Sequence, residues 1–189
     1  MAAAYEEGGA TCLSVLTDEA FFGGSSADLR AAREATSRPV LRKDFTVDPV
    51  DVLDARLMGA DAVLLIVAAL TAGELAELHA LARSVGLDAL VEVHDEAEVT
   101  QALDVGAELI GVNQRDLVTF EVDTARAVRV ASTIPDGVVR VAESGIRGPE
   151  DLPALAEAGY HAVLVGESVV TRDDPVDAVR ALRSGGALR

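Results

Sequence analysis

The chain repeats one local pattern: a stretch with helical spacing, then a glycine, then a short apolar run. Gly9, Gly59, Gly106 and Gly159 each stand just before such a run. Glycine readily takes the left-handed conformation that ends a helix, and a short run rich in β-branched residues favours a buried strand. Helix, glycine and buried strand make up the βα unit of an α/β protein. This repeat constrains the fold more than any other feature of the sequence.

The pattern predicts seven strands and seven complete helices, with a stub of another helix at the start. The strands are expected at Thr11–Thr17, Pro39–Phe45, Ala62–Val67, Asp88–Val93, Leu109–Asn113, Val138–Glu143 and Ala162–Gly166. The helices are expected at about Ser26–Ala35, Pro49–Met58, Ala72–Val85, Glu96–Val105, Thr124–Ser132, Pro149–Ala158 and Pro175–Leu182. Such regular alternation is typical of a doubly wound sheet or of a (β/α)8 barrel.

Two features favour the barrel. No Gly-x-Gly-x-x-Gly motif follows a strand, so a dinucleotide-binding sheet has weak support. Polar residues follow strand after strand, and barrels build their active sites at the carboxyl ends of their strands. We therefore expect a TIM (β/α)8-type barrel, truncated to about seven βα units and open between its first and last strands. It would form a single domain over residues 1–189.

Composition excludes several classes of function. The formal net charge is −16, which argues against a general nucleic-acid binder but not against a small anionic ligand. No apolar run is long enough for a membrane span, and the N-terminus lacks signal-peptide features, so a cytoplasmic protein is expected. The single cysteine, Cys12, excludes an intrachain disulfide and is expected in the core. His79, His94 and His161 share no metal-ligand spacing, so no metal site is expected.

One residue is singled out by composition alone. The 16 basic residues are 15 arginines and one lysine, Lys43. Lysine can release a proton near neutral pH when its surroundings lower its pKa, whereas arginine effectively cannot. A lone lysine against this background indicates a task that arginine cannot perform, although chance is the ordinary alternative.

A polar or glycine residue stands at or just beyond the carboxyl end of most predicted strands, at an equivalent place. These residues are Lys43, Glu92, Asn113 with Arg115, Glu143 with Ser144, and Gly166 with Glu167. Each has an ordinary structural explanation when taken singly, such as a helix cap, a turn or a local ion pair. In a closed barrel they would converge on one mouth, where partial dehydration shifts pKa values enough for acid–base chemistry.

The last two of these strand ends favour an anion. In many barrels the loops after the last two strands bind phosphate through backbone N–H groups. Glycine allows the backbone to approach the anion closely. Ser144, Gly145, Gly166 and Glu167 are therefore predicted to bind the phosphate of a small phosphorylated substrate.

Seven motifs match one known family in order and spacing, over essentially the whole chain. They are Leu13–Thr17 with Phe21–Ser25, Leu41–Phe45, Ala62–Val67, Leu90–His94, Ile110–Leu117, Val141–Ile146 and Val163–Ser168. On these motifs the sequence resembles the indole-3-glycerol-phosphate synthase family. The pair Asn-x-Arg-Asp-Leu and Ala-Glu-Ser-Gly-Ile is specific to that family among phosphate-binding barrels.

The resemblance implies a carboxy-lyase of tryptophan biosynthesis that needs no cofactor. It closes the indole ring of 1-(2-carboxyphenylamino)-1-deoxyribulose 5-phosphate, with loss of carbon dioxide and water, to give indole-3-glycerol phosphate. Lys43 would protonate the substrate carbonyl, and Glu92 would orient the substrate or deprotonate it. Asn113 and Glu143 would hold hydroxyl and amine groups, and Arg115 would meet the anthranilate carboxylate. The apolar pocket for the ring would be formed by Phe22, Phe45, Leu64, Leu117 and Ile146.

The sequence also departs from the family. Family members begin with a longer segment whose first strand carries Glu-x-Lys-x-x-Ser-Pro-Ser, and with it a second lysine that this sequence does not contain. A missing acid lowers the rate, so weak activity is expected. One alternative is a non-catalytic protein derived from the enzyme that binds a phosphate ligand or a partner. A lesser one is an isomerase or synthase of a related barrel family. The open edges at Thr11 and Ala162 predict a homo-oligomer or a partner chain that covers them.

Overall fold

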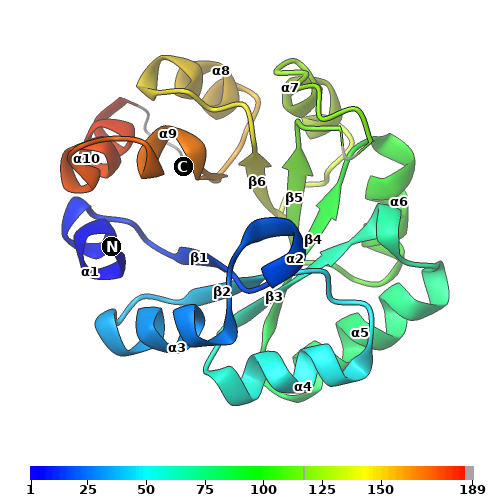
Figure 1. Ribbon diagram of the computed structural model, residues 1–189. Coiled ribbons are helices and arrows are strands. Elements are labelled where there is room, and N and C mark those ends of the chain that lie inside the picture. Colours follow the sequence, from blue (N-terminus) through cyan, green and yellow to red (C-terminus); the bar gives the residue numbers. More distant parts are fainter. Residues whose placement is uncertain (117, 186–189) are drawn as a thin grey trace. The chain divides into compact units, whose positions relative to one another are not determined.

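The protein is described by a computed structural model for residues 1–116 and 118–185 (Figure 1). The chain forms two compact units, Met1–Val91 and Glu92–Arg189, and each is considered in turn. The expectation of a single domain over residues 1–189 stays a prediction. No helix in the described part of the chain is both long enough and apolar enough to cross a membrane.

The first unit alternates strands and helices. Its elements are α1 (Ala2–Gly8), β1 (Leu13–Leu16), α2 (Glu19–Phe22), α3 (Ser26–Ala35), β2 (Val40–Lys43), α4 (Pro49–Met58), β3 (Ala62–Ile66), the 3-10 helix η1 (Val67–Ala69), α5 (Ala72–Ser84) and the start of β4 (Asp88–Val93). The strands are parallel, with Leu16 opposite Lys43 and Leu41 opposite Ala62. In Figure 1, α3, α4 and α5 run alongside these strands. The side chains that these helices bury, such as Leu29 and Val52, form the core of the unit.

Local sequence signals fix where these helices begin and end. Asp48 caps α4 in a reciprocal capping box with Asp51, directly before a proline whose missing N–H costs nothing there. Thr71 and Glu74 make the same box at the start of α5. All four repeat glycines have positive φ, between 76° and 97°, as the helix–glycine–strand pattern predicts.

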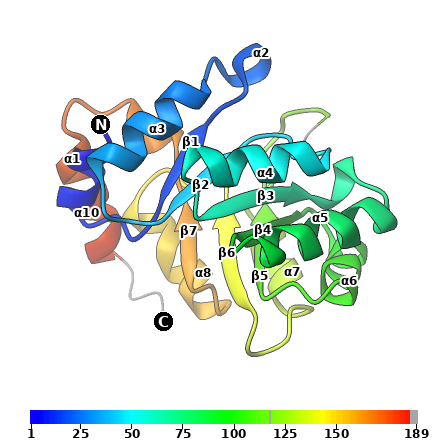
Figure 2. The ribbon, with the colours of Figure 1, turned by 90° about the horizontal axis from the view of Figure 1, so that it is seen from below.

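The second unit continues the same alternation. Its elements are the end of β4, α6 (Glu96–Asp104), β5 (Leu109–Asn113), α7 (Arg126–Ala131), β6 (Val139–Glu143), the 3-10 helix η2 (Pro149–Asp151), α8 (Leu152–Glu157), β7 (Ala162–Leu164), α9 (Glu167–Val170) and α10 (Pro175–Gly185). Strands β5, β6 and β7 are parallel, with Asn113 opposite Glu143 and Glu143 opposite Leu164. Figure 2 shows β6 and β7 side by side with α8 beside them.

The strand order confirms the expected fold class. The sheet runs β1-β2-β3-β4-β5-β6-β7, so each strand pairs with the next along the chain, as in a (β/α)8-type barrel. The order has two ends, β1 and β7, as expected for a sheet open between its first and last strands.

Some details differ from the expectation. The short helices α2 and α9 were not predicted, although Asp18 caps α2 and Gly23 ends it in the left-handed conformation. Both helices are shorter than the periodicity of an amphipathic face can reveal. Cys12 is exposed rather than buried, because β1 begins only at Leu13 and the residue lies before it.

Two tyrosines give a matched test of buried hydroxyl groups. Tyr160 is 1% exposed, and its hydroxyl donates to the Ala127 carbonyl at 2.7 Å. The buried hydroxyl of Tyr5 has no hydrogen-bond partner within residues 1–116 and 118–185. Tyr160→Phe should lower the free energy of unfolding by about 1–2 kcal/mol, because a buried carbonyl loses its donor. Tyr5→Phe should not lower it in the same urea titration, because the buried hydroxyl has no hydrogen bond to lose among the described residues. Equal losses in both variants would contradict this reasoning.

Candidate active site

Lys43 ends strand β2 in the first unit. It pairs with Leu16 of β1, and its side chain is half-buried. Side chains alternate along a strand, so Lys43 shares its face with Leu41 and turns away from the face of Arg42. Leu64 of β3, which is 2% exposed, lies on the same face as Lys43 by the register of Leu41 with Ala62. The lysine is therefore presented beside apolar strand residues.

The opposite face of β2 carries a buried polar network that fixes the strand end. Arg42, 8% exposed, donates to Asp44 Oδ2 at 2.8 Å and to the Asp51 carbonyl at 2.6 Å. Thr17 donates to the same Asp44 oxygen, and Asp44 Oδ1 accepts the Phe45 N–H at 2.8 Å. Each charge in this network has a partner, as buried charges require. The network holds the backbone on both sides of Lys43.

Three phenylalanines form an aromatic cluster in the same unit. Phe22 stacks on Phe45 with ring centroids 5.7 Å apart, and Phe21 meets Phe45 edge-on at 5.5 Å. Phe21 and Phe22 are 75% and 45% exposed, so both offer open ring surface. Phe22 and Phe45 were predicted to line an apolar pocket, whereas Phe21 was missed. The position of Phe21 next to Phe22 in the sequence was the signal that could have identified it as a pocket residue.

In the second unit, three predicted residues come together on neighbouring strands. Glu92 and Glu143 are each 1% exposed, and Asn113 is 6% exposed. Asn113 Nδ2 donates to Glu92 Oε1 at 3.0 Å. Asn113 is also the register partner of Glu143, which places those two side chains on one face of the sheet. Burial of two carboxylates and an amide in one place costs free energy that an ordinary core would avoid.

The loop after β5 is built on Asn113. Asn113 Oδ1 accepts the Arg115 N–H at 3.0 Å, which orients the start of the loop. Arg115 pairs with Val122 in an antiparallel bridge and donates to the Phe120 carbonyl at 3.2 Å. Its guanidinium lies 3.7 Å from Glu167 Oε2, and the arginine side chain is 36% exposed. It is therefore held at the loop surface as a planar donor. Leu117, predicted for the apolar pocket, lies outside the described residues.

The loop after β6 has an unusual backbone. Ser144 and Gly145 are consecutive left-handed residues, with φ of 62° and 71°. Gln114, 2% exposed, donates to the Ser144 carbonyl at 2.8 Å and so holds this conformation. Successive left-handed residues turn backbone N–H groups toward one side, which suits an anion. Gln114 was not predicted as a site residue.

The loop after β7 is tied to the loop after β6. Ser168 donates to the Ile146 carbonyl at 2.9 Å, and Ile146 is 6% exposed. Gly166 caps the short helix α9, which begins at Glu167. The Glu167 side chain is 84% exposed and carries a negative charge, so only its backbone could favour a phosphate.

His94 was not predicted to take part in the site, yet it lies beside Glu92. Its Nε2 is 3.6 Å from Glu92 Oε1, and its Nδ1 is 3.1 Å from Glu98 Oε2. Burial disfavours the charged ring, but the hydrogen bond with Glu98 and the charges of both carboxylates outweigh this effect. The pKa of His94 is therefore raised above its ordinary value of 6.5. The spacing of Glu92 and His94, two residues apart at the end of β4, was the available signal.

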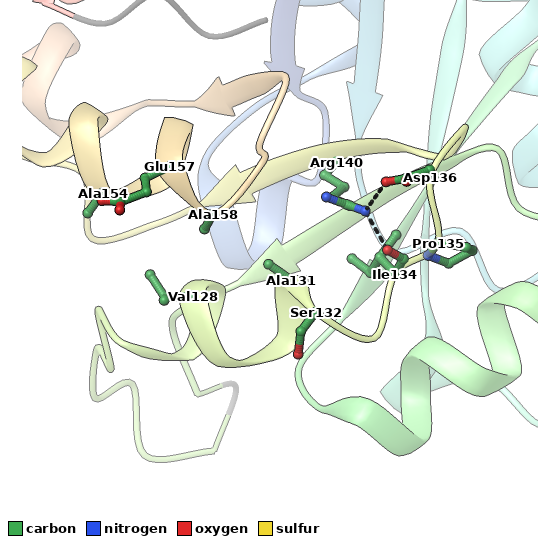
Figure 3. Close-up of a pocket in the computed structure, with 10 residues that line it drawn as sticks. All are labelled: Val128, Ala131, Ser132, Ile134, Pro135, Asp136, Arg140, Ala154, Glu157 and Ala158. Carbon is green, nitrogen blue, oxygen red and sulfur yellow. Dashed lines mark hydrogen bonds and ion pairs between the residues drawn. The ribbon is translucent and has the colours of Figure 1, made fainter.

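A surface pocket of about 650 Å³ lies elsewhere in the second unit (Figure 3). It is lined by residues from α7, from the segment between α7 and β6, from the start of β6 and from α8, and none of them was predicted as a site residue. Arg140 is turned toward the Ile134 carbonyl and Asp136, at 2.5 and 3.4 Å. The pocket lies beside the first residues of β6, whereas Glu143 ends that strand. Barrels hold their reactive groups at the carboxyl end, so this pocket is not the candidate site.

Comparison with known proteins agrees with the motifs. The family model described as "Indole-3-glycerol phosphate synthase" matches residues 1–182. Indole-3-glycerol phosphate synthase of Beutenbergia cavernae is 54% identical over 187 residues, which are 99% of this chain and 69% of that protein. Indole-3-glycerol phosphate synthase 1 of Streptomyces coelicolor is 56% identical over 186 residues, 98% of this chain and 69% of that protein.

Solved structures share the fold at low sequence identity. A 3-hexulose-6-phosphate synthase has a TM-score of 0.79 at 18% identity and covers 98% of this chain and 94% of its own. A thiamine phosphate pyrophosphorylase from Pyrococcus furiosus has a TM-score of 0.75 at 18% identity, and the match covers 97% of this chain and 86% of that one. At this identity the likeness concerns the fold alone.

Proposed function

Because the chain belongs to the indole-3-glycerol-phosphate synthase family, we propose that its strand-end residues carry out the family's ring closure. The substrate is 1-(2-carboxyphenylamino)-1-deoxyribulose 5-phosphate, and the product is indole-3-glycerol phosphate. The family's enzymes are carboxy-lyases of tryptophan biosynthesis, and we infer a cytoplasmic location from that role. The observation that carries the assignment of residues is the buried set of Glu92, Asn113 and Glu143 on one face of the sheet.

The proposed roles follow the chemistry of each group. Lys43 protonates the substrate carbonyl, because an ammonium can give up a proton that a guanidinium keeps. Glu92 acts as the base or orienting carboxylate, held through Oε1 by Asn113. Glu143 and Asn113 hold the amine and hydroxyl groups of the substrate. Membership in the family, rather than a measured distance, is what joins Lys43 to the other three residues.

The two ends of the substrate need different partners. Arg115 offers planar donors that match the anthranilate carboxylate. Phe22, Phe45, Leu64 and Ile146 supply apolar surface for the ring, and the exposed stack of Phe22 on Phe45 supports this role. The phosphate is assigned to the backbone around Ser144 and Gly145 and around Gly166 and Glu167. The left-handed pair at 144 and 145 supports that assignment.

A non-catalytic, phosphate-binding descendant of the enzyme is the alternative function, and no observation favours it over the enzyme. We propose as well that a second copy or a partner chain covers the open edges at β1 and β7. The ends of the strand order support this proposal, since an unpaired strand edge recruits another strand.

A direct assay separates the enzyme from the binding protein. The purified chain is titrated calorimetrically with substrate and with indole-3-glycerol phosphate, and the same sample is then assayed for turnover. Formation of indole-3-glycerol phosphate together with carbon dioxide is the expected result. Binding of both compounds without turnover would establish the alternative, and absence of both would refute the proposed function.

A further inference from the structure

His94 lies between two carboxylates of the second unit. It follows β4 directly and stands two residues after Glu92, so both side chains project from the same face of the sheet. Glu98 of α6 makes two contacts with His94, both through Oε2. It accepts the His94 backbone N–H at 2.7 Å, and it lies 3.1 Å from Nδ1 of the ring. The imidazole is 12% exposed and is directed with Nε2 toward Glu92. The orientation of the ring is therefore set by Glu98, which is not one of the predicted catalytic residues.

His94 and Asn113 converge on one oxygen atom. Asn113 Nδ2 donates to Glu92 Oε1 at 3.0 Å, and His94 Nε2 lies 3.6 Å from the same atom. The second distance is that of an ion pair, slightly longer than a hydrogen bond. Two donors that approach one carboxylate oxygen from two different residues restrict the rotation of that carboxylate. Such restriction matters because a catalytic base must be aligned with the proton that it receives.

The protonation state of His94 decides how many hydrogen-bond acceptors its ring can donate to. A protonated imidazole carries two N–H donors, one for Glu98 and one for Glu92, whereas a neutral ring carries only one. Of the charged groups that face the ring, Glu92 on β4 and Glu98 on α6 favour the protonated form, and Arg126 on α7 opposes it. Neighbouring Asn113 on β5 is uncharged. The raised pKa of His94 agrees with this balance.

We propose that His94, as an imidazolium held by Glu98, is a positioning residue that fixes the Glu92 carboxylate for the reaction. The inference rests on the proposed function of Glu92 but assigns a role that the family motifs do not. Deprotonation of the ring removes the positive charge that faces Glu92 Oε1. Turnover therefore falls as the pH rises through the pKa of His94, which lies above 6.5. The stabilisation that the two ion pairs give the fold is likewise present below that pKa and lost above it.

The test combines a titration with a kinetic profile. His94→Gln keeps an amide donor near Glu92 but cannot carry a charge. Glu98→Gln keeps an acceptor for the ring but removes the negative charge that favours its protonated form. His161→Gln is the matched control, because it removes another histidine of the same unit, one whose Nδ1 accepts the Arg140 backbone N–H. We expect His94→Gln to lower kcat about tenfold at neutral pH with little change in KM. It should also remove the contribution of His94 to the alkaline limb of the pH profile, so that the remaining limb comes from Lys43, whereas His161→Gln should leave kcat and the profile unchanged.

A second readout does not need turnover. The His94 ring protons are followed by NMR as a function of pH in the free protein, and the pKa should fall in Glu98→Gln and in Glu92→Gln. If the wild-type chain does not turn over but the pKa of His94 still depends on Glu92, the proposed function fails and the inference about the pair stands. An unshifted His94 titration in Glu92→Gln, or an unchanged pH profile in His94→Gln, would overturn the inference. His94→Asn replaces His94→Gln if that variant does not fold.

Discussion

Replacing Lys43 by arginine is expected to lower turnover by a factor of about 10²–10⁴ while the protein stays folded. The guanidinium keeps the positive charge, so electrostatic attraction of the substrate phosphate and carboxylate is preserved. Arginine cannot give up its proton near neutral pH, so the step that protonates the carbonyl is lost. The variant therefore separates charge from acidity at a single position.

The surroundings of Lys43 make this variant informative. The polar network that fixes the end of β2 consists of Arg42, Asp44 and Thr17 and lies on the opposite face of the strand. A change at Lys43 leaves that network in place, so the free energy of unfolding should change by less than about 1 kcal/mol. Steady-state kinetics and a urea titration of the same preparation provide the two measurements.

Two controls accompany the lysine variant. Lys43→Ala should lose turnover to a similar degree but should also weaken binding of indole-3-glycerol phosphate, because the charge is gone. Arg56→Ala removes a positive charge from an exposed position on α4 of the same unit and should leave turnover unchanged. Turnover of Lys43→Arg within about threefold of wild type would show that Lys43 is not the acid.

Gly145→Ala is expected to disrupt substrate binding at both ends. A Cβ atom at this position would lie 2.5 Å from Val122 Cγ1, too close for any real contact, so the Val122 side chain or the loop that carries it must shift. Val122 forms the bridge with Arg115, which is assigned to the substrate carboxylate. We therefore expect one added methyl group to disturb the phosphate loop and, through the bridge of Val122, the arginine as well. KM should rise at least tenfold, with a cost of about 1–3 kcal/mol for overpacking.

A matched glycine isolates the cause. Gly137 also has a positive φ, 92°, but a Cβ there would meet nothing within 4 Å. Both alanine variants incur the cost of the left-handed backbone, about 1–2 kcal/mol, and only Gly145→Ala adds the clash. Binding of indole-3-glycerol phosphate by calorimetry and unfolding in urea should thus separate the two variants.

Removal of the obstructing side chain should restore part of the function. The double variant Gly145→Ala with Val122→Ala is expected to recover affinity relative to Gly145→Ala, with a coupling free energy of about 0.5–3 kcal/mol. Additive effects of the two changes, or equal losses of affinity in Gly137→Ala and Gly145→Ala, would show that the loss in Gly145→Ala does not come from the contact with Val122.

Much of this protein is encoded locally. Helical spacing, a left-handed glycine and a β-branched run recur within a few residues of one another, so the βα repeat can be read without tertiary information. The bounds of α3 and α4 and the caps at Asp48 and Thr71 follow from such signals. The parallel strand order then places Glu92, Asn113 and Glu143 at equivalent ends of neighbouring strands, which is why these strand-end residues could be named in advance.

The contacts that refine the site join residues far apart in the chain, and only the tertiary structure decides them. Gln114 reaches the Ser144 carbonyl across 30 residues, and Val122 limits what position 145 can hold. Phe21 joins the aromatic cluster because a short helix turns it toward Phe45. His94 meets Glu92 through the alternation of a strand, but its charge also depends on Glu98 from the following helix. Periodicity in the sequence fixes which face a side chain occupies, whereas its neighbours on that face depend on how the elements pack.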